Sequence, residues 1–313
     1  MSGSRPKTFL SGAGLVWKWQ RLVWWIFAVT LIFGFLSTQG MVDRAAGTLN
    51  HSFASKRLVD GWDASAVTEL MQLPNSPIEF QGPAVIHFSI VFAVFMLFLT
   101  GGILTTYLRD KKPHAASFFE ACGQYFWRFF RLLIYFAIVL IPIGAICAGV
   151  GALYDKIDAD SISPFSAVYF FAAAAIVVLL LFAMVRLWFD MAEVIAVADD
   201  ERRMHRALRR AARVLWHNFF SLLWLYVSIA IIGLVLFFFG LRLWMTFLAP
   251  QSNILAFLLS QLMILAWIGT RLWQRASEAL WYREYAQTSV REPIWTPSPT
   301  TLVTQSVATN PES

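Results

Sequence analysis

Six long apolar segments alternate with short polar ones along this chain. Each apolar segment has roughly 20 residues and is almost free of charge, and at about 1.5 Å of rise per helical residue this length matches the hydrocarbon core of a bilayer. Lipid provides no hydrogen-bond partner for the backbone, so such segments are expected to be helical. The predicted spans are residues 22–41, 83–107, 132–153, 164–188, 219–239 and 253–273.

The composition supports an all-α polytopic membrane protein. Hydrophobic residues make up 58% of the 313 residues, which is more than a soluble domain of this length needs for its core. We expect one transmembrane domain, residues 1–286, followed by a disordered cytoplasmic tail, residues 287–313, that is rich in Pro, Thr and Ser. The longest outer segment, residues 42–82, is expected to form short amphipathic helices that contact the outer leaflet or a partner.

Lys and Arg residues lie almost entirely on alternate sides of the predicted spans. The first, third, fifth and last non-spanning segments contain 20 of the 25 Lys and Arg residues. Positively charged segments stay on the cytoplasmic side, so both chain termini are predicted to be cytoplasmic. The net charge of +6 is then a consequence of topology, because these arginines meet anionic headgroups. No nucleic-acid partner is expected.

Short sequence matches relate the spans in pairs. Residues 129–133 (FFRLL) before the third span match residues 219–223 (FFSLL) before the fifth. An RLW motif followed by an acid ends the fourth span at residues 186–188 with Glu193, and the sixth at residues 271–273 with Glu278. These matches predict three parallel hairpin repeats, about residues 11–108, 114–189 and 204–274, each beginning with an interfacial amphipathic helix.

A basic amphipathic helix is predicted between residues 199 and 217. Three acidic residues, Asp199, Asp200 and Glu201, are interpreted as its start, because negative charge favours a helix N-terminus. Arginines then recur at helical spacing, opposite a face of Met204, Leu208 and small apolar residues. The arginines are Arg202, Arg203, Arg206, Arg209, Arg210 and Arg213. We interpret this segment as a helix in the membrane interface that contacts anionic lipids of the cytoplasmic leaflet or an acidic partner.

Charged residues at the ends of the fourth and sixth spans are expected to form structural ion pairs. Arg186 and Asp190 are four residues apart on one helix face, and Arg275 lies three residues before Glu278. Arg271 shares that face two turns from Glu278. We interpret these residues as a salt-bridge girdle between repeats, in which long side chains reach water at the cytoplasmic boundary.

The predicted membrane interior contains few polar residues and no charged residue at mid-depth. Ser228, Ser260 and Gln261 are candidate polar groups of a cavity, and His87 near the outer edge of the second span is a candidate pH-responsive residue. Small residues are common in the spans, for example Gly101 and the glycines around Pro142. They predict close helix packing within the bundle or against another membrane protein.

The layout of six spans resembles that of poorly understood bacterial integral membrane families. The residues that carry the resemblance run from Arg186-Leu187-Trp188 through Asp190, Glu193 and Asp199 to Ala207-Leu208-Arg209. They are similar to the membrane domain attached to some glycerophosphodiester phosphodiesterases. This resemblance implies a bacterial inner (plasma) membrane protein, and no residue of this chain matches a catalytic position.

The sequence predicts a protein that is not an enzyme and has no cofactor. It contains no nucleophile beside a base, no paired carboxylates and no metal-ligand spacing, and His87, His114 and Asp110 lie on different sides of the membrane. Two functions are compatible with this inventory. The favoured one is a subunit or scaffold of a membrane complex, with anionic lipids and other membrane proteins as partners. The alternative is a permease or exporter of a neutral or amphiphilic solute.

Overall fold

The computed structural model describes residues 5–49, 65, 81–110, 114–160, 164–248 and 253–291. Within these ranges the chain forms helices and no strand, which confirms the all-α prediction. Most of the predicted outer segment, residues 50–64 and 66–80, lies outside the described residues, and so does the chain beyond Arg291.

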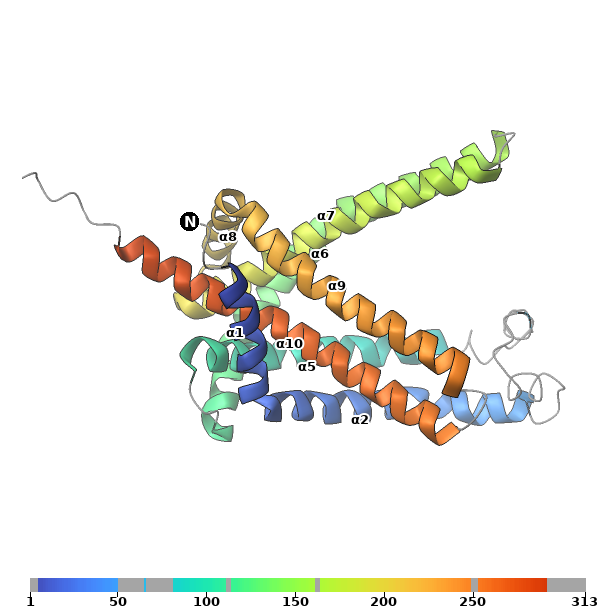
Figure 1. Ribbon diagram of the computed structural model, residues 1–313, viewed down its shortest axis with the longest axis horizontal. Helices are drawn as coiled ribbons and strands as arrows, with labels where there is room; N and C mark the ends of the chain where they lie inside the picture. The colour runs from blue at the N-terminus through green and yellow to red at the C-terminus, as the bar shows by residue number, and fades with distance from the viewer. Residues whose placement is uncertain are drawn as a thin grey trace, which may run out of the picture.

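Figure 1 shows how the helices are arranged along the chain. Their bounds are α1 Arg5–Lys18, α2 Gln20–Leu49, α5 Gln81–Arg109, α6 Ala115–Asp160, α7 Pro164–Ala198, α8 Met204–His217, α9 Phe219–Leu243 and α10 Asn253–Arg291, with a π-helical turn, η1 Trp244–Leu248, after α9. A separate short helix precedes α2 and another precedes α9: these are α1 and α8. In the second predicted repeat the interfacial segment and the span form one continuous helix, α6. The three-repeat arrangement stays a prediction.

Six of these helices are long and apolar enough to cross a membrane, which supports an integral membrane protein. Each of the six helices contains one predicted span. Their apolar segments differ from the predicted spans at the ends and are Gln20–Thr38, Ile86–Arg109, Ala115–Ile157, Tyr169–Ala198, Phe219–Thr246 and Ile254–Gln287. Helix α6 continues through Pro142. Helix α10 runs to Arg291, so the prediction that the tail is disordered from residue 287 is wrong for its first five residues.

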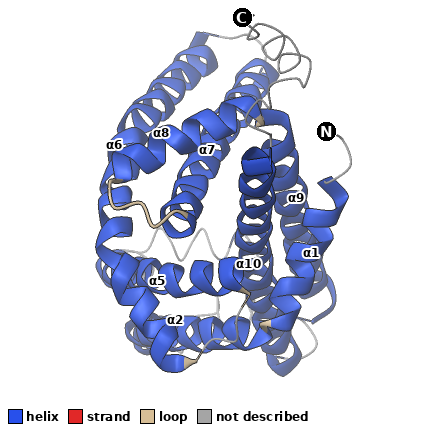
Figure 2. Cartoon of the chain, turned by 90° about the vertical axis from the view of Figure 1, so that its left-hand side faces the viewer, coloured by secondary structure: helices blue, strands red, loops and turns tan. Residues whose placement is uncertain are grey.

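The helices come together at one end of the molecule and separate toward the other. Helices α1 and α8, the last turns of α5 and α7 and the start of α6 lie on the left in Figure 1, and we name this the basic end. From there the α6–α7 hairpin diverges from the group of α2, α5, α9 and α10, as Figures 1 and 2 show. The outer half of this hairpin therefore has few neighbours, and Val177 on α7 is 64% exposed.

Two apolar clusters fill the basic end. One joins α7 and α8 to α6 and is centred on residues such as Phe129, Met191 and Ile195, while the other joins α1, α5 and α10 around Ile103 and Tyr107. These residues are at most 2% exposed. Most side chains that the protein itself buries thus lie where the amphipathic helices cover the ends of the spans.

The predicted close packing of small residues is found at Gly101 on α5 but not at Gly144 and Gly149 on α6. A Cβ atom on Gly101 would lie 2.9 Å from the Ala121 carbonyl oxygen, so α5 and α6 touch through this glycine. A Cβ atom on Gly144 or Gly149 of α6 would meet nothing within 4 Å. These two glycines do not make contacts within the described part of the bundle, and their packing against another protein stays a prediction.

Candidate functional site

Helix α8 covers the basic end with its apolar face inward. Met204, Ala207, Leu208 and Ala211 are buried against α7 and its neighbours. The Trp188 indole of α7 donates a hydrogen bond of 2.9 Å to the Leu208 carbonyl oxygen, which fixes the helix in place. The expectation that this face lies in the interface is therefore wrong in one respect: the face is buried in protein rather than in lipid.

The arginines of this segment lie at the protein surface. All six, Arg202, Arg203, Arg206, Arg209, Arg210 and Arg213, are exposed. Arg210 makes an ion pair of 3.0 Å with Asp199, at the end of α7. A basic surface outside and an apolar face inside follow directly from the 3.6-residue period of the sequence.

The three acidic residues before α8 do not start that helix. Its N-cap is Arg203, whose backbone N–H donates to the Glu201 carboxylate at 3.2 Å. Asp199 and Asp200 instead follow α7, where Arg210 and Arg128 bind their carboxylates. Their partners lie 11 and 72 residues away in the sequence, so the prediction made from local charge alone was wrong.

One ion pair joins α7 to α10, and another lies within α7. Arg186 Nη2 lies 3.1 Å from Asp190 Oδ1, as the four-residue spacing predicts. The predicted pair of Arg275 with Glu278 is not formed, because Arg275 Nη1 lies 3.0 Å from Glu193 Oε2 on the neighbouring helix. This contact links the two helices that carry the RLW motifs.

The remaining members of the predicted girdle have other partners. Glu278 is 2% exposed and accepts a hydrogen bond of 3.2 Å from Gln274. Its second oxygen has no partner among the described residues. Arg271 is exposed, and its guanidinium lies 5.0 Å from the centre of the Trp267 ring. Asp190, Glu193 and Glu278 were expected to reach water, but all three are buried in the protein.

Helix α1 is held to the same region by two contacts. The Trp273 indole donates a hydrogen bond of 2.8 Å to the Phe9 carbonyl oxygen, and the Lys18 ammonium group lies 2.8 Å from Asp110 Oδ1. The hydrogen bond from Lys18 holds the pKa of Asp110 below its ordinary value. Trp188 and Trp273, the tryptophans of the two RLW motifs, thus each bind the backbone of an amphipathic helix.

The polar residues proposed for a membrane cavity are not brought together. Ser228 and Ser260 donate to carbonyl oxygens of their own helices, those of Trp224 and Phe257. Gln261 contacts Ser260 at 3.5 Å, but its carbonyl oxygen is buried and has no partner among the described residues. His87 is exposed on α5. Ser228 lines a small cavity with Thr8 and Trp281 that contains none of the other three.

In the described ranges, no three His, Cys, Asp or Glu side chains are placed to hold a metal ion. The Glu193–Arg275 pair was missed because its partners are 82 positions apart. Gln274 was missed as well, although its spacing of four residues from Glu278 is a local signal.

Comparison of the chain with protein-family models, curated proteins and solved structures found no match. The resemblance to the membrane domain of glycerophosphodiester phosphodiesterases therefore stays a prediction.

Proposed function

We propose that this integral membrane protein is a non-catalytic subunit or scaffold of a membrane complex, whose basic end faces the cytoplasm and contacts anionic lipids. The resemblance noted above favours a bacterial inner membrane. The observation that carries the proposal is the position of α8, which is docked on α7 with all six arginines exposed. Each arginine near an anionic leaflet contributes about 1 kcal/mol to attraction.

Exposed aromatic residues support a position of α8 at the membrane surface. Trp216 at the end of α8 is 85% exposed, and Phe220 and Trp224 follow at intervals of four residues on α9. Tryptophans favour the boundary between hydrocarbon and water, where an apolar ring and a polar N–H group are both accommodated. This stripe would lie in the headgroup layer directly beside the arginines.

The permease alternative has no specific support in the described residues. It requires polar groups around a shared path, and Ser228 lines a cavity that contains neither Ser260 nor Gln261. The subunit or scaffold is therefore the function that we retain.

Two measurements on the full chain test this function. The first is native mass spectrometry of the purified protein at low salt with phosphatidylglycerol or phosphatidylcholine. Replacing Arg202, Arg206, Arg209 and Arg213 by Gln is expected to reduce the number of phosphatidylglycerol molecules retained, and replacing the same four by Lys is the charge-matched control. Equal retention by the Gln variant and the wild type would contradict the lipid contact.

The second measurement concerns the complex. Purification in mild detergent from the native membrane should recover a second membrane protein in constant ratio to this chain. A chain that is recovered alone under several detergents would contradict the subunit role. The two results are independent, since lipid retention is measured on the isolated protein.

A further inference from the structure

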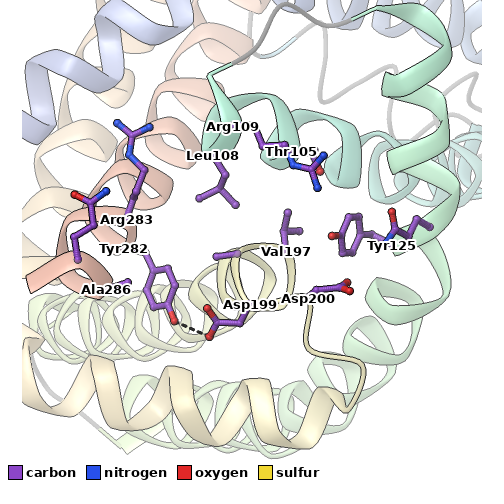
Figure 3. Close-up of a pocket in the computed structure, with 13 residues that line it drawn as sticks. Thr105, Leu108, Arg109, Tyr125, Val197, Asp199, Asp200, Tyr282, Arg283 and Ala286 are labelled. Atoms are coloured by element: carbon purple, nitrogen blue, oxygen red, sulfur yellow. Dashed lines mark hydrogen bonds between the residues drawn. The ribbon is translucent and has the colours of Figure 1, made fainter. Parts of the chain in front are cut away.

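A cavity of about 790 Å³ opens at the basic end between α5, α6, α7 and α10 (Figure 3). Its apolar wall includes Leu108, Val197 and Ala286. Its charged and aromatic groups are Arg109, Tyr125, Asp199, Asp200, Tyr282 and Arg283. The cavity lies one helical turn beyond the buried carboxylates of Glu193 and Glu278, because Val197 follows Glu193 by four residues and Tyr282 follows Glu278 by four.

Both acidic residues of the cavity are already neutralised by arginines. Asp199 Oδ2 accepts hydrogen bonds of 3.0 Å from Arg210 and from the Tyr282 hydroxyl, the second of which is drawn in Figure 3. Asp200 Oδ1 accepts a hydrogen bond of 2.6 Å from Arg128. This bond holds the pKa of Asp200 below its ordinary value. The two carboxylates are thus occupied and leave little attraction for a cationic ligand.

The two arginines that line the cavity are not bound in this way by Asp199 or Asp200. No carboxylate of the described residues makes an ion pair with Arg109 or Arg283. In Figure 3 both lie above the centre of the cavity, whereas Asp199 and Asp200 lie below it. Together with Arg128, Arg210 and Lys18, the region has five cationic groups and the three carboxylates of Asp110, Asp199 and Asp200. Asp110 pairs with Lys18 and is also attracted by Arg283. The C-termini of α5 and α7 add about half a negative charge each, so the balance stays positive.

The cavity also lies at the level expected for lipid headgroups. Two of the six apolar segments, Ile86–Arg109 and Tyr169–Ala198, end at its wall. Guanidinium groups bind phosphate oxygens with paired N–H donors, and the apolar wall can accommodate the glycerol and the first carbons of an acyl chain. We propose that the cavity is a binding site for a phosphate group, held by Arg109 and Arg283, and that an anionic glycerophospholipid supplies it.

This site is distinct from the surface of α8 and is tested separately from it. Native mass spectrometry of the full chain with phosphatidylglycerol is done at about 0.5 M salt, where the screening length of about 4 Å weakens contacts that depend on exposed charges alone. In the cavity the lipid would also contact the apolar wall of Leu108, Val197 and Ala286, and salt does not screen that part of the contact. The wild type is expected to retain one lipid per chain. The R109Q/R283Q variant should bind it at least about tenfold more weakly, as expected for the loss of hydrogen bonds to a charged group.

The matched control is R206Q/R209Q, which removes the same charge from α8 outside the cavity and should retain the lipid like the wild type. Arg109 and Arg283 are both exposed, so their replacement by Gln is expected to leave the fold intact, and each single variant is measured as well. Unchanged retention by R109Q/R283Q, or equal loss in the control, would overturn the proposal.

Inorganic phosphate distinguishes the two sources of the phosphate group. Displacement of the lipid by millimolar inorganic phosphate, lost in R109Q/R283Q, would show that the phosphate group alone is recognised and that a soluble phosphate is the ligand. Retention of the lipid under the same conditions would show that the glycerol and acyl parts contribute, as expected for a membrane lipid.

Discussion

The basic end of the bundle and the outer half of the α6–α7 hairpin are held by different interactions. At the basic end, Glu193 and Arg275 join two helices and apolar side chains are buried by α1 and α8. In the outer half, large apolar residues such as Ile146 and Val177 are 48% and 64% exposed, and the hairpin contacts mainly itself, for example through Tyr154 and Phe171.

This difference follows from the solvent that each region meets. Lipid tails are as apolar as Leu or Ile side chains, so moving such side chains from lipid to a contact between spans contributes little free energy of stabilisation. Polar pairs and close backbone contacts must then determine which helices associate. The basic end has both, namely the Glu193–Arg275 pair and the close contact of Gly101 with α6.

The largest expected effect comes from breaking the Glu193–Arg275 pair. Removing one partner of a buried ion pair leaves the other charge unpaired, which costs roughly 3–5 kcal/mol. E193Q and R275Q should each lower the stability of the protein against denaturing detergent, and the double variant should lose less than the sum of the two. The control is R242Q, an exposed arginine at the opposite end. Additive effects of the two substitutions would contradict a direct pair.

A smaller effect is expected from Gly101→Ala on α5. The new methyl group would lie 2.9 Å from the Ala121 carbonyl oxygen, and such overpacking costs about 1–3 kcal/mol. Gly149→Ala on α6 meets nothing and should be neutral or slightly stabilising, because Ala favours a helix. Thermal unfolding in detergent measures both. A loss of stability in Gly149→Ala would show that this face of α6 contacts another copy or protein.

The smallest effect is expected for the Lys18–Asp110 pair, whose side chains are 52% and 40% exposed. Exposed pairs contribute less than about 1 kcal/mol. The pKa of Asp110 is lowered in the folded protein, so the contribution is present above its ordinary pKa of 3.8 and is lost as pH falls below that value. The stability difference between wild type and D110N should disappear below this pH and in high salt. A difference that persists there would show that Asp110 acts through another contact.

Local patterns predicted the helices well and their contacts less well. The hydropathy of each span is a property of that segment, so all six were found. The sequence offers Arg275 a partner on its own helix, Glu278. Arg275 instead pairs with Glu193, because the fold brings α7 next to α10. Similarly, the sequence of α8 is compatible with an apolar face that contacts either lipid or protein. The structure shows that this face is buried against α7.

Three properties could be read from the order of residues alone: the chain is helical, six of its segments are apolar enough to cross a bilayer, and its arginines are concentrated between particular spans. These features depend on the transfer of each segment from water to lipid, which does not require knowledge of the other segments. Only the tertiary structure decided which charges pair, which glycines touch a neighbour, and that Arg109 and Arg283 line one cavity. These depend on where helices meet, and residues that are more than 100 positions apart become neighbours only through the fold.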